Sequence, residues 1–225
     1  MYHFPIKPYA GRNGKVVAMR SFCSSRHPCV LLTLVVLAVS LTVLVAGWGF
    51  GFEPLVRWQA GQNASVPVSA LCIALISFAS LRSGKRFRPV QAAALGAALI
   101  FVVLASIPAL DRSVWLLTSP RAGDGCALAT RIGLVLASLS PAIRLGVVRL
   151  PADWRFHAPF FGLVAAGLAV VLISLDPELA NLIPSFGGLS LLTAVLMACL
   201  FAAQLLDQLR TEGLAAERDD DVQSA

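Results

Sequence analysis

The residue with the clearest potential for chemistry is Arg131, because it lies inside a long apolar run, Cys126 to Val148. An ionisable side chain in a membrane span is costly to bury and marks a candidate functional site. Two interpretations stay open. Arg131 lies only about one and a half turns from the start of the run, so its long stem can carry the guanidinium to the outer surface. Alternatively, it is buried and pairs with Asp124 or binds an anion.

The same region yields a predicted ligand-binding site between helices near the outer face, formed by Arg131, Asp124 and Trp115. Pro141, near the middle of the run, removes one helical hydrogen bond and is predicted to kink the helix. A kink can act as a hinge, although packing is its commoner role.

Other chemistry is poorly represented. Haem ligation needs a histidine within the bundle, and no histidine, aspartate or glutamate lies deep in an apolar run. The five cysteines behave as unpaired thiols or small apolar residues, and too few ligands are suitably spaced for a metal. We therefore expect no catalytic residues, no cofactor, no metal and no enzyme activity.

Composition indicates the class of protein. Hydrophobic residues make up 57% of the 225 residues and charged residues 13%, whereas soluble domains carry about 25% charge. The run Val30 to Phe50 contains no charge, and about 20 helical residues span the roughly 30 Å hydrocarbon core of a bilayer. The sequence predicts an all-α integral membrane protein whose lipid partner is the bilayer.

Six transmembrane helices are predicted, at about 30–50, 64–81, 90–110, 126–148, 157–175 and 186–206. They form a membrane domain, 29–206, between a basic cytoplasmic segment, 1–28, and a polar acidic cytoplasmic tail, 207–225.

Charge predicts the orientation. With both termini inside, fourteen of the eighteen Lys and Arg residues fall on the inner side, and each outer loop carries an acid. This distribution follows the positive-inside rule and predicts N-in, C-in topology in a cell inner membrane. Because the net charge of +6 is placed in these short segments, we expect no nucleic-acid partner.

The three runs that pass from outside to inside open in a similar way, with Pro or Gly, small residues and a Ser or Thr. They indicate three repeated helical hairpins, which arise either from duplication or from the low complexity of membrane sequence.

One of these openings, Pro67-Val68-Ser69-Ala70-Leu71-Cys72, resembles the Pro-x-Thr-Ala-Leu-Cys phrase in the N-terminal membrane sensor modules of bacterial sensor histidine kinases and diguanylate cyclases. The resemblance implies a sensing or signal-relay module. Asp207 to Ala225 contain no kinase or cyclase residues, so we expect the effector to be missing or on another chain.

The leading hypothesis is a non-enzymatic bacterial sensory or interaction module, with a membrane or cytoplasmic protein partner or a second copy. A small transporter or permease subunit is the second hypothesis, favoured by the repeat and broken helices. An assembly scaffold is the third, because glycines let helices pack closely; the glycines in question are Gly96, Gly162, Gly167, Gly187 and Gly188. The tail either passes a helix rotation to a partner or is a short amphipathic end.

Overall fold

The computed structural model of the protein describes residues 27–56, 64–81, 84–107, 126–151, 153–176, 182–183, 185–186 and 188–223. Every regular element in these residues is a helix, which confirms the predicted all-α class for this part of the chain. The helices are α2 (His27–Thr42), its π-helical continuation η1 (Val43–Gly49), α3 (Glu53–Val56), α4 (Pro67–Ser80), the 3-10 helix η2 (Lys85–Phe87), α5 (Arg88–Leu104), α7 (Leu128–Leu145), α8 (Trp154–Leu175) and α10 (Leu191–Gln223).

Five helical segments in the described residues are long and apolar enough to cross a membrane. They are Pro28–Gly49, Lys85–Leu104, Leu128–Leu145, Trp154–Leu175 and Leu191–Gly213. Each matches one of the apolar runs expected from the sequence. The protein therefore has the construction of a membrane protein.

The remaining run, predicted as a helix over 64–81, is helical only over the 14 residues of α4. At 1.5 Å per residue this helix is about 21 Å long, less than the roughly 30 Å of a bilayer core. Pro67 sets its beginning, because a residue that precedes proline disfavours helical geometry, and Val66 is extended. Leu81 is also extended and ends the helix. The predicted helix is therefore too long at both ends.

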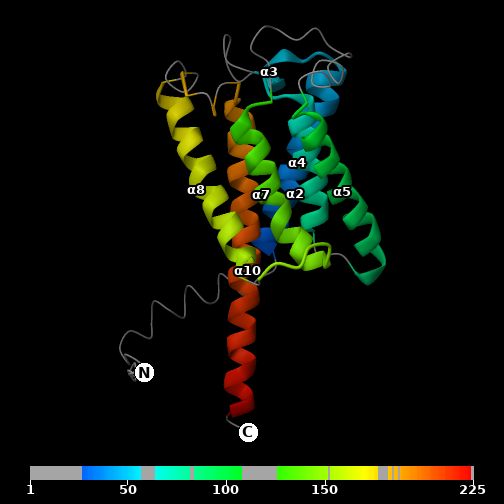
Figure 1. Cartoon of the computed structure of the whole chain (residues 1–225), viewed down its shortest axis with the longest axis vertical. Coiled ribbons are helices and arrows are strands. Elements are labelled where there is room, and N and C mark those ends of the chain that lie inside the picture. The colour runs from blue at the N-terminus through cyan, green and yellow to red at the C-terminus, as the bar shows by residue number, and fades with distance from the viewer. Residues whose placement is uncertain are drawn as a thin grey trace.

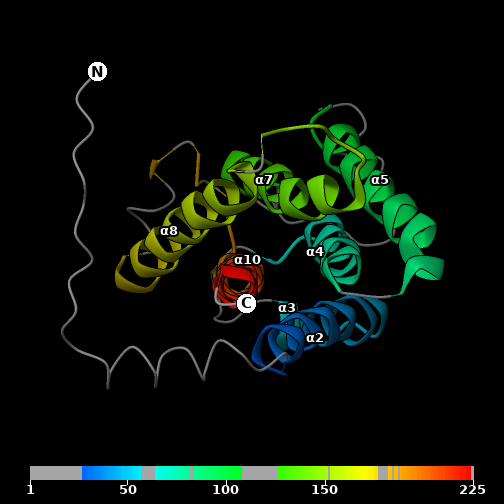
Figure 2. The same cartoon turned by 90° about the horizontal axis from the view of Figure 1, so that it is seen from below.

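The helices form a bundle in which consecutive long helices run in opposite directions (Figure 1). Seen along its axis, α4 and α10 lie inside, and α2, α5, α7 and α8 lie around them (Figure 2). Contacts agree, since α10 touches α8, α2, α7 and α4, and α4 touches α5, α2, α7 and α10. The lower part of α10 projects beyond the bundle, and we call that end of the bundle the tail end.

Large side chains of α10 fill the space between the helices. Phe201 and Leu200 are fully buried, as is Ile73 of α4. A Cβ atom on Gly162 of α8 would lie 2.3 Å from the Phe201 ring, so this predicted close approach is confirmed.

The other predicted glycines differ. A Cβ atom on Gly96 or Gly167 would meet nothing within 4 Å, so the prediction that these two glycines allow close helix packing is wrong. Gly187 lies outside the described residues, and Gly188 has a positive φ of 84°. Gly133 of α7 is a close approach that the sequence analysis missed, because a Cβ there would lie 1.9 Å from Met197 Cε.

The outer surface of the bundle is apolar. Leu31 and Leu34 on α2, Ile100 on α5, and Phe161 and Leu168 on α8 are all exposed. A soluble protein rarely exposes apolar surface on this scale, whereas lipid contact requires it.

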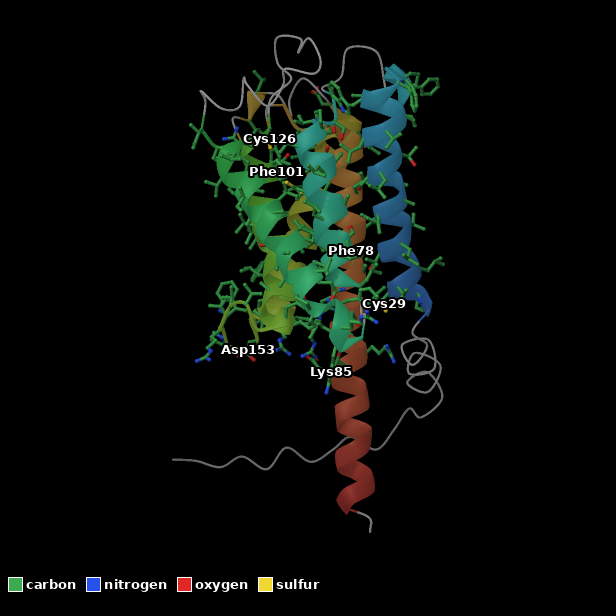
Figure 3. The ribbon with its side chains drawn as sticks, turned by 90° about the vertical axis from the view of Figure 1, so that its right-hand side faces the viewer. Cys29, Phe78, Lys85, Phe101, Cys126 and Asp153 are labelled. Carbon is green, nitrogen blue, oxygen red and sulfur yellow. The ribbon has the colours of Figure 1, made fainter. Side chains whose placement is uncertain are left out.

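Charged side chains gather at the tail end. The basic residues described there are Lys85, Arg86, Arg88, Arg144, Arg149, Arg155 and Arg210. Figure 3 shows Lys85 and Asp153 at this end and Cys126 at the opposite end. The described part of the chain therefore has one strongly basic end.

Candidate functional site

The ligand site predicted from the sequence is only partly described. Arg131 lies in the first turn of α7, is partly buried, and its backbone N–H donates to the Ala127 carbonyl at 3.1 Å. Asp124 and Trp115 lie outside the described residues. Their association with Arg131 therefore stays a prediction.

An apolar pocket of about 210 Å³ lies between α7, α8 and α10, on the turn of α7 that follows Arg131. Its walls are Ala129, Ile132, Gly133 and Leu136 from α7, Gly162, Ala165, Ala166 and Ala169 from α8, Ser185, Phe186 and Leu189 before α10, and Ala194, Met197 and Phe201 from α10. Ser185 supplies the one polar side chain among them. The pocket suits an apolar group, which the charged residues predicted for this region did not indicate. Glycine and alanine at helical spacing on two neighbouring runs were the available signal.

Pro141 gives rise to a contact between α7 and α10. It lies inside α7, which continues to Leu145. Because proline has no N–H, the carbonyl of Ala137 loses its helical donor. Gln204 of α10 replaces that donor, since its Nε2 atom donates to the Ala137 oxygen at 2.8 Å and to Ser80 Oγ at 3.3 Å. The sequence identified the proline, and the predicted kink stays a prediction, but the partner of the freed carbonyl was not foreseen.

The end of α4 is capped by two other helices. Arg144 of α7 donates from Nη1 to the Ser80 carbonyl at 2.8 Å and from Nη2 to the carbonyls of Ala79 and Leu81. Gln91 of α5 donates to the Leu81 carbonyl at 2.6 Å and to the Phe78 carbonyl at 3.3 Å. Helix ends leave carbonyls without donors, and a membrane interior offers no water to replace them. These two side chains therefore allow α4 to end inside the protein.

Together these residues form one layer, the inner polar cluster, which consists of Ser80, Gln91, Ser140, Arg144, Gln204 and Gln208. Gln208 of α10 adds a hydrogen bond of 3.3 Å to Ser140 Oγ of α7. A cavity of about 30 Å³, the size of one water molecule, adjoins the cluster beside Thr33 and Asp207. The cluster joins α4, α5, α7 and α10 near the tail end.

A smaller polar group lies at the opposite end of α10. Ser190 caps the helix, because its Oγ accepts from the Thr193 N–H at 3.1 Å. Thr193 Oγ1 lies 3.1 Å from Ser65 Oγ, and Trp48 Nε1 donates to the Ser65 carbonyl at 2.8 Å. These bonds anchor the beginning of α10 to the segment before α4.

Within the described ranges, no group of three or more His, Cys, Asp or Glu side chains is arranged to hold a metal ion. The described cysteines, Cys29, Cys72, Cys126 and Cys199, are free thiols. Cys72 donates to the Ala98 carbonyl at 3.6 Å, and therefore contributes to the contact between α4 and α5.

No protein-family model, no curated protein and no solved structure matches the chain. The functional argument therefore depends on the geometry of the helices, the apolar pocket and the inner polar cluster.

Proposed function

We propose that the protein is a multi-pass sensory module of a bacterial inner membrane, in which α10 relays a change inside the bundle to a partner at the tail end. The observation that carries this proposal is the continuity of α10. It is one helix of 33 residues, about 50 Å long, which touches four other helices and then projects beyond them (Figure 1). A movement of its buried part is passed to the projecting part because no loop intervenes.

The inner polar cluster supports this role. A relay needs an element with two discrete arrangements that a signal can bias. Gln204 holds α10 to a carbonyl of α7 that no backbone donor in its own helix can satisfy. Breaking or remaking this bond shifts α10 against α7 without unfolding either helix.

The apolar pocket is the proposed point of input. Its wall includes Met197 and Phe201, which stand one to two turns before Gln204 on α10. An apolar ligand there would contact α10 directly, and Arg131 and Asp124 would lie towards its outer mouth. This location is consistent with the site expected near the outer face.

The proposed topology has six spans with both termini inside, and it counts α4 as a short span completed by Ala64 to Val66 and Leu81. The basic tail end supports a cytoplasmic assignment for that end. Epitope tags inserted at Gly84 and at Asp124 test it. We expect them to be accessible from opposite compartments, and access from the same compartment would refute the topology.

The relay is tested by fusing a diguanylate cyclase output domain to Gln223 in two ways. In the rigid fusion α10 continues directly into the helix of the output domain, and in the flexible fusion a Gly/Ser linker intervenes. Gln204→Leu is then introduced into both. An allosteric coupling of about 1 kcal/mol changes activity about fivefold, and we expect a change of this size in the rigid fusion only.

Arg149→Gln is the matched control, because Arg149 is exposed at the same end and lies outside the cluster. An unchanged rigid fusion of Gln204→Leu refutes the relay. Equal changes in both fusions also refute it, because a flexible linker transmits no helix movement. Solute uptake by the purified protein in vesicles, with no response in the rigid fusion, would support the permease hypothesis instead.

A further inference from the structure

A second, chemically different cavity of about 310 Å³ lies at the tail end of the bundle. It is lined by Leu81 after α4, Arg88 and Gln91 from α5, Arg144 and Leu145 from α7, Arg155 from α8, and Thr211 from α10. Its volume is about ten times that of one water molecule. Five helical segments therefore meet around a space large enough for a polar group with its substituents.

Charge distinguishes this cavity from the apolar pocket. Three of its seven lining residues are arginines, two others are an amide and a hydroxyl, and none is acidic. The nearest acid in a described cavity is Asp207, which lines the neighbouring 30 Å³ cavity that shares Arg144. Asp153 precedes α8 and is exposed. Like charges in one cavity repel, so an anion between the arginines lowers the energy of the folded state.

The arginines are also placed to bind rather than only to repel. Arg88 is the first residue of α5 and Arg155 the second residue of α8. Both cavity walls are therefore helix N-termini, whose dipoles favour negative charge. Arg155 Nε is buried and has no hydrogen-bond partner among the described residues. A buried donor of this kind needs an acceptor.

We propose that this cavity binds a phosphate group. The planar guanidinium matches two phosphate oxygens at once, and Arg88 and Arg155 approach from different helices. Gln91 and Thr211 add neutral donors. Arg144 also caps α4, so it contributes positive charge more than free donors.

The phosphate has two possible sources. An anionic phospholipid supplies it from the leaflet at the tail end, where basic pockets between helices bind lipid headgroups. A soluble phosphorylated molecule supplies it from the aqueous phase. Thr211 belongs to α10, so the occupied cavity touches this helix where it leaves the bundle. Phosphate binding does not depend on the relay and stands or falls separately.

The full-length protein is purified in a neutral detergent and divided between two assays. In the first, it is reconstituted in nanodiscs of phosphatidylcholine containing phosphatidylglycerol, released, and tested for retained lipid by native mass spectrometry. In the second, the delipidated protein is titrated with inorganic phosphate and with sulfate. Each is repeated for the double variant Arg88→Gln, Arg155→Gln.

Arg86→Gln, Arg149→Gln is the control, because both residues are exposed at the same end and neither lines the cavity. Charge-assisted bonds to phosphate are strong, so removing two arginines should weaken retention at least about tenfold. Arg144 stays unchanged so that α4 keeps its cap. A variant with Arg88→Lys and Arg155→Lys keeps the charge and should retain part of the binding.

Selective retention of phosphatidylglycerol that is lost in the cavity variant and kept in the control supports the site with a lipid source. Phosphate binding without lipid selectivity, lost in the same variant, supports it with a soluble source. The proposal is overturned if neither probe binds, or if the cavity and control variants lose equal binding, since surface charge then explains the result. A cavity variant that elutes and melts as the unaltered protein does excludes misfolding as the cause.

Discussion

The contact between Gln204 and the carbonyl freed by Pro141 can be measured by a double-mutant cycle. Gln204→Leu removes two donated hydrogen bonds, to Ala137 and to Ser80. Hydrogen bonds between membrane helices average about 0.6 kcal/mol, so the two contribute about 1.2 kcal/mol. Gln204 Oε1 is buried and accepts no hydrogen bond, and its removal offsets part of that loss. We expect a net destabilisation of about 1 kcal/mol.

Pro141→Ala changes this result because alanine supplies an N–H four residues after Ala137. The helix then satisfies the Ala137 carbonyl itself, and Gln204→Leu loses little more than the bond to Ser80. The expected coupling energy between the two positions is therefore one interhelical hydrogen bond, about 0.6 to 1.7 kcal/mol.

The assay is reversible unfolding in mixed micelles of dodecylmaltoside and dodecylsulfate, followed by circular dichroism. Thr193→Val is the control substitution, because Thr193 bonds to Ser65 and Ser190 at the opposite end of the bundle. Its cost should be the same with Pro141 present or replaced, as distant sites are additive. A coupling energy between Gln204 and Pro141 below about 0.3 kcal/mol would refute the reasoning.

Two further predictions concern packing and capping. Gly162→Ala should destabilise the bundle by about 1 to 3 kcal/mol, because the new Cβ would lie 2.3 Å from the Phe201 ring, whereas Gly167→Ala should be neutral or stabilising; thermal unfolding in detergent compares them. Arg144→Met should lower stability by about 3 kcal/mol or more, because it leaves three carbonyls at the end of α4 without a donor. Exposed Arg149→Met should leave the melting temperature unchanged, and equal effects at the two arginines would contradict the capping role.

The five long helices were predictable because each depends on a local property, an apolar run without charge. The boundaries of α4 were half predictable. Pro67 marks its beginning through local geometry, but its other end is set by donors 10 and 64 residues further along the chain. No periodicity reveals such distant partners.

The candidate sites were less predictable for the same reason. Arg88, Arg144 and Arg155 were counted in the sequence as residues that orient the chain, which depends only on which loop they occupy. Their meeting in one cavity depends on the packing of three helices. Gln204 carried no signal at all, because a single amide in an apolar run has no pattern.

The cap on α4 also constrains how the protein is made. Ser80 leaves the ribosome 64 residues before Arg144, its final donor. At a synthesis rate of about 5 to 20 residues per second, this interval lasts about 3 to 13 seconds. Gln91 arrives early, but the other carbonyls need water or the insertion machinery until α7 is complete. Biogenesis therefore includes a waiting period in which α4 stays at the edge of the lipid phase, and the arrival of one arginine ends it.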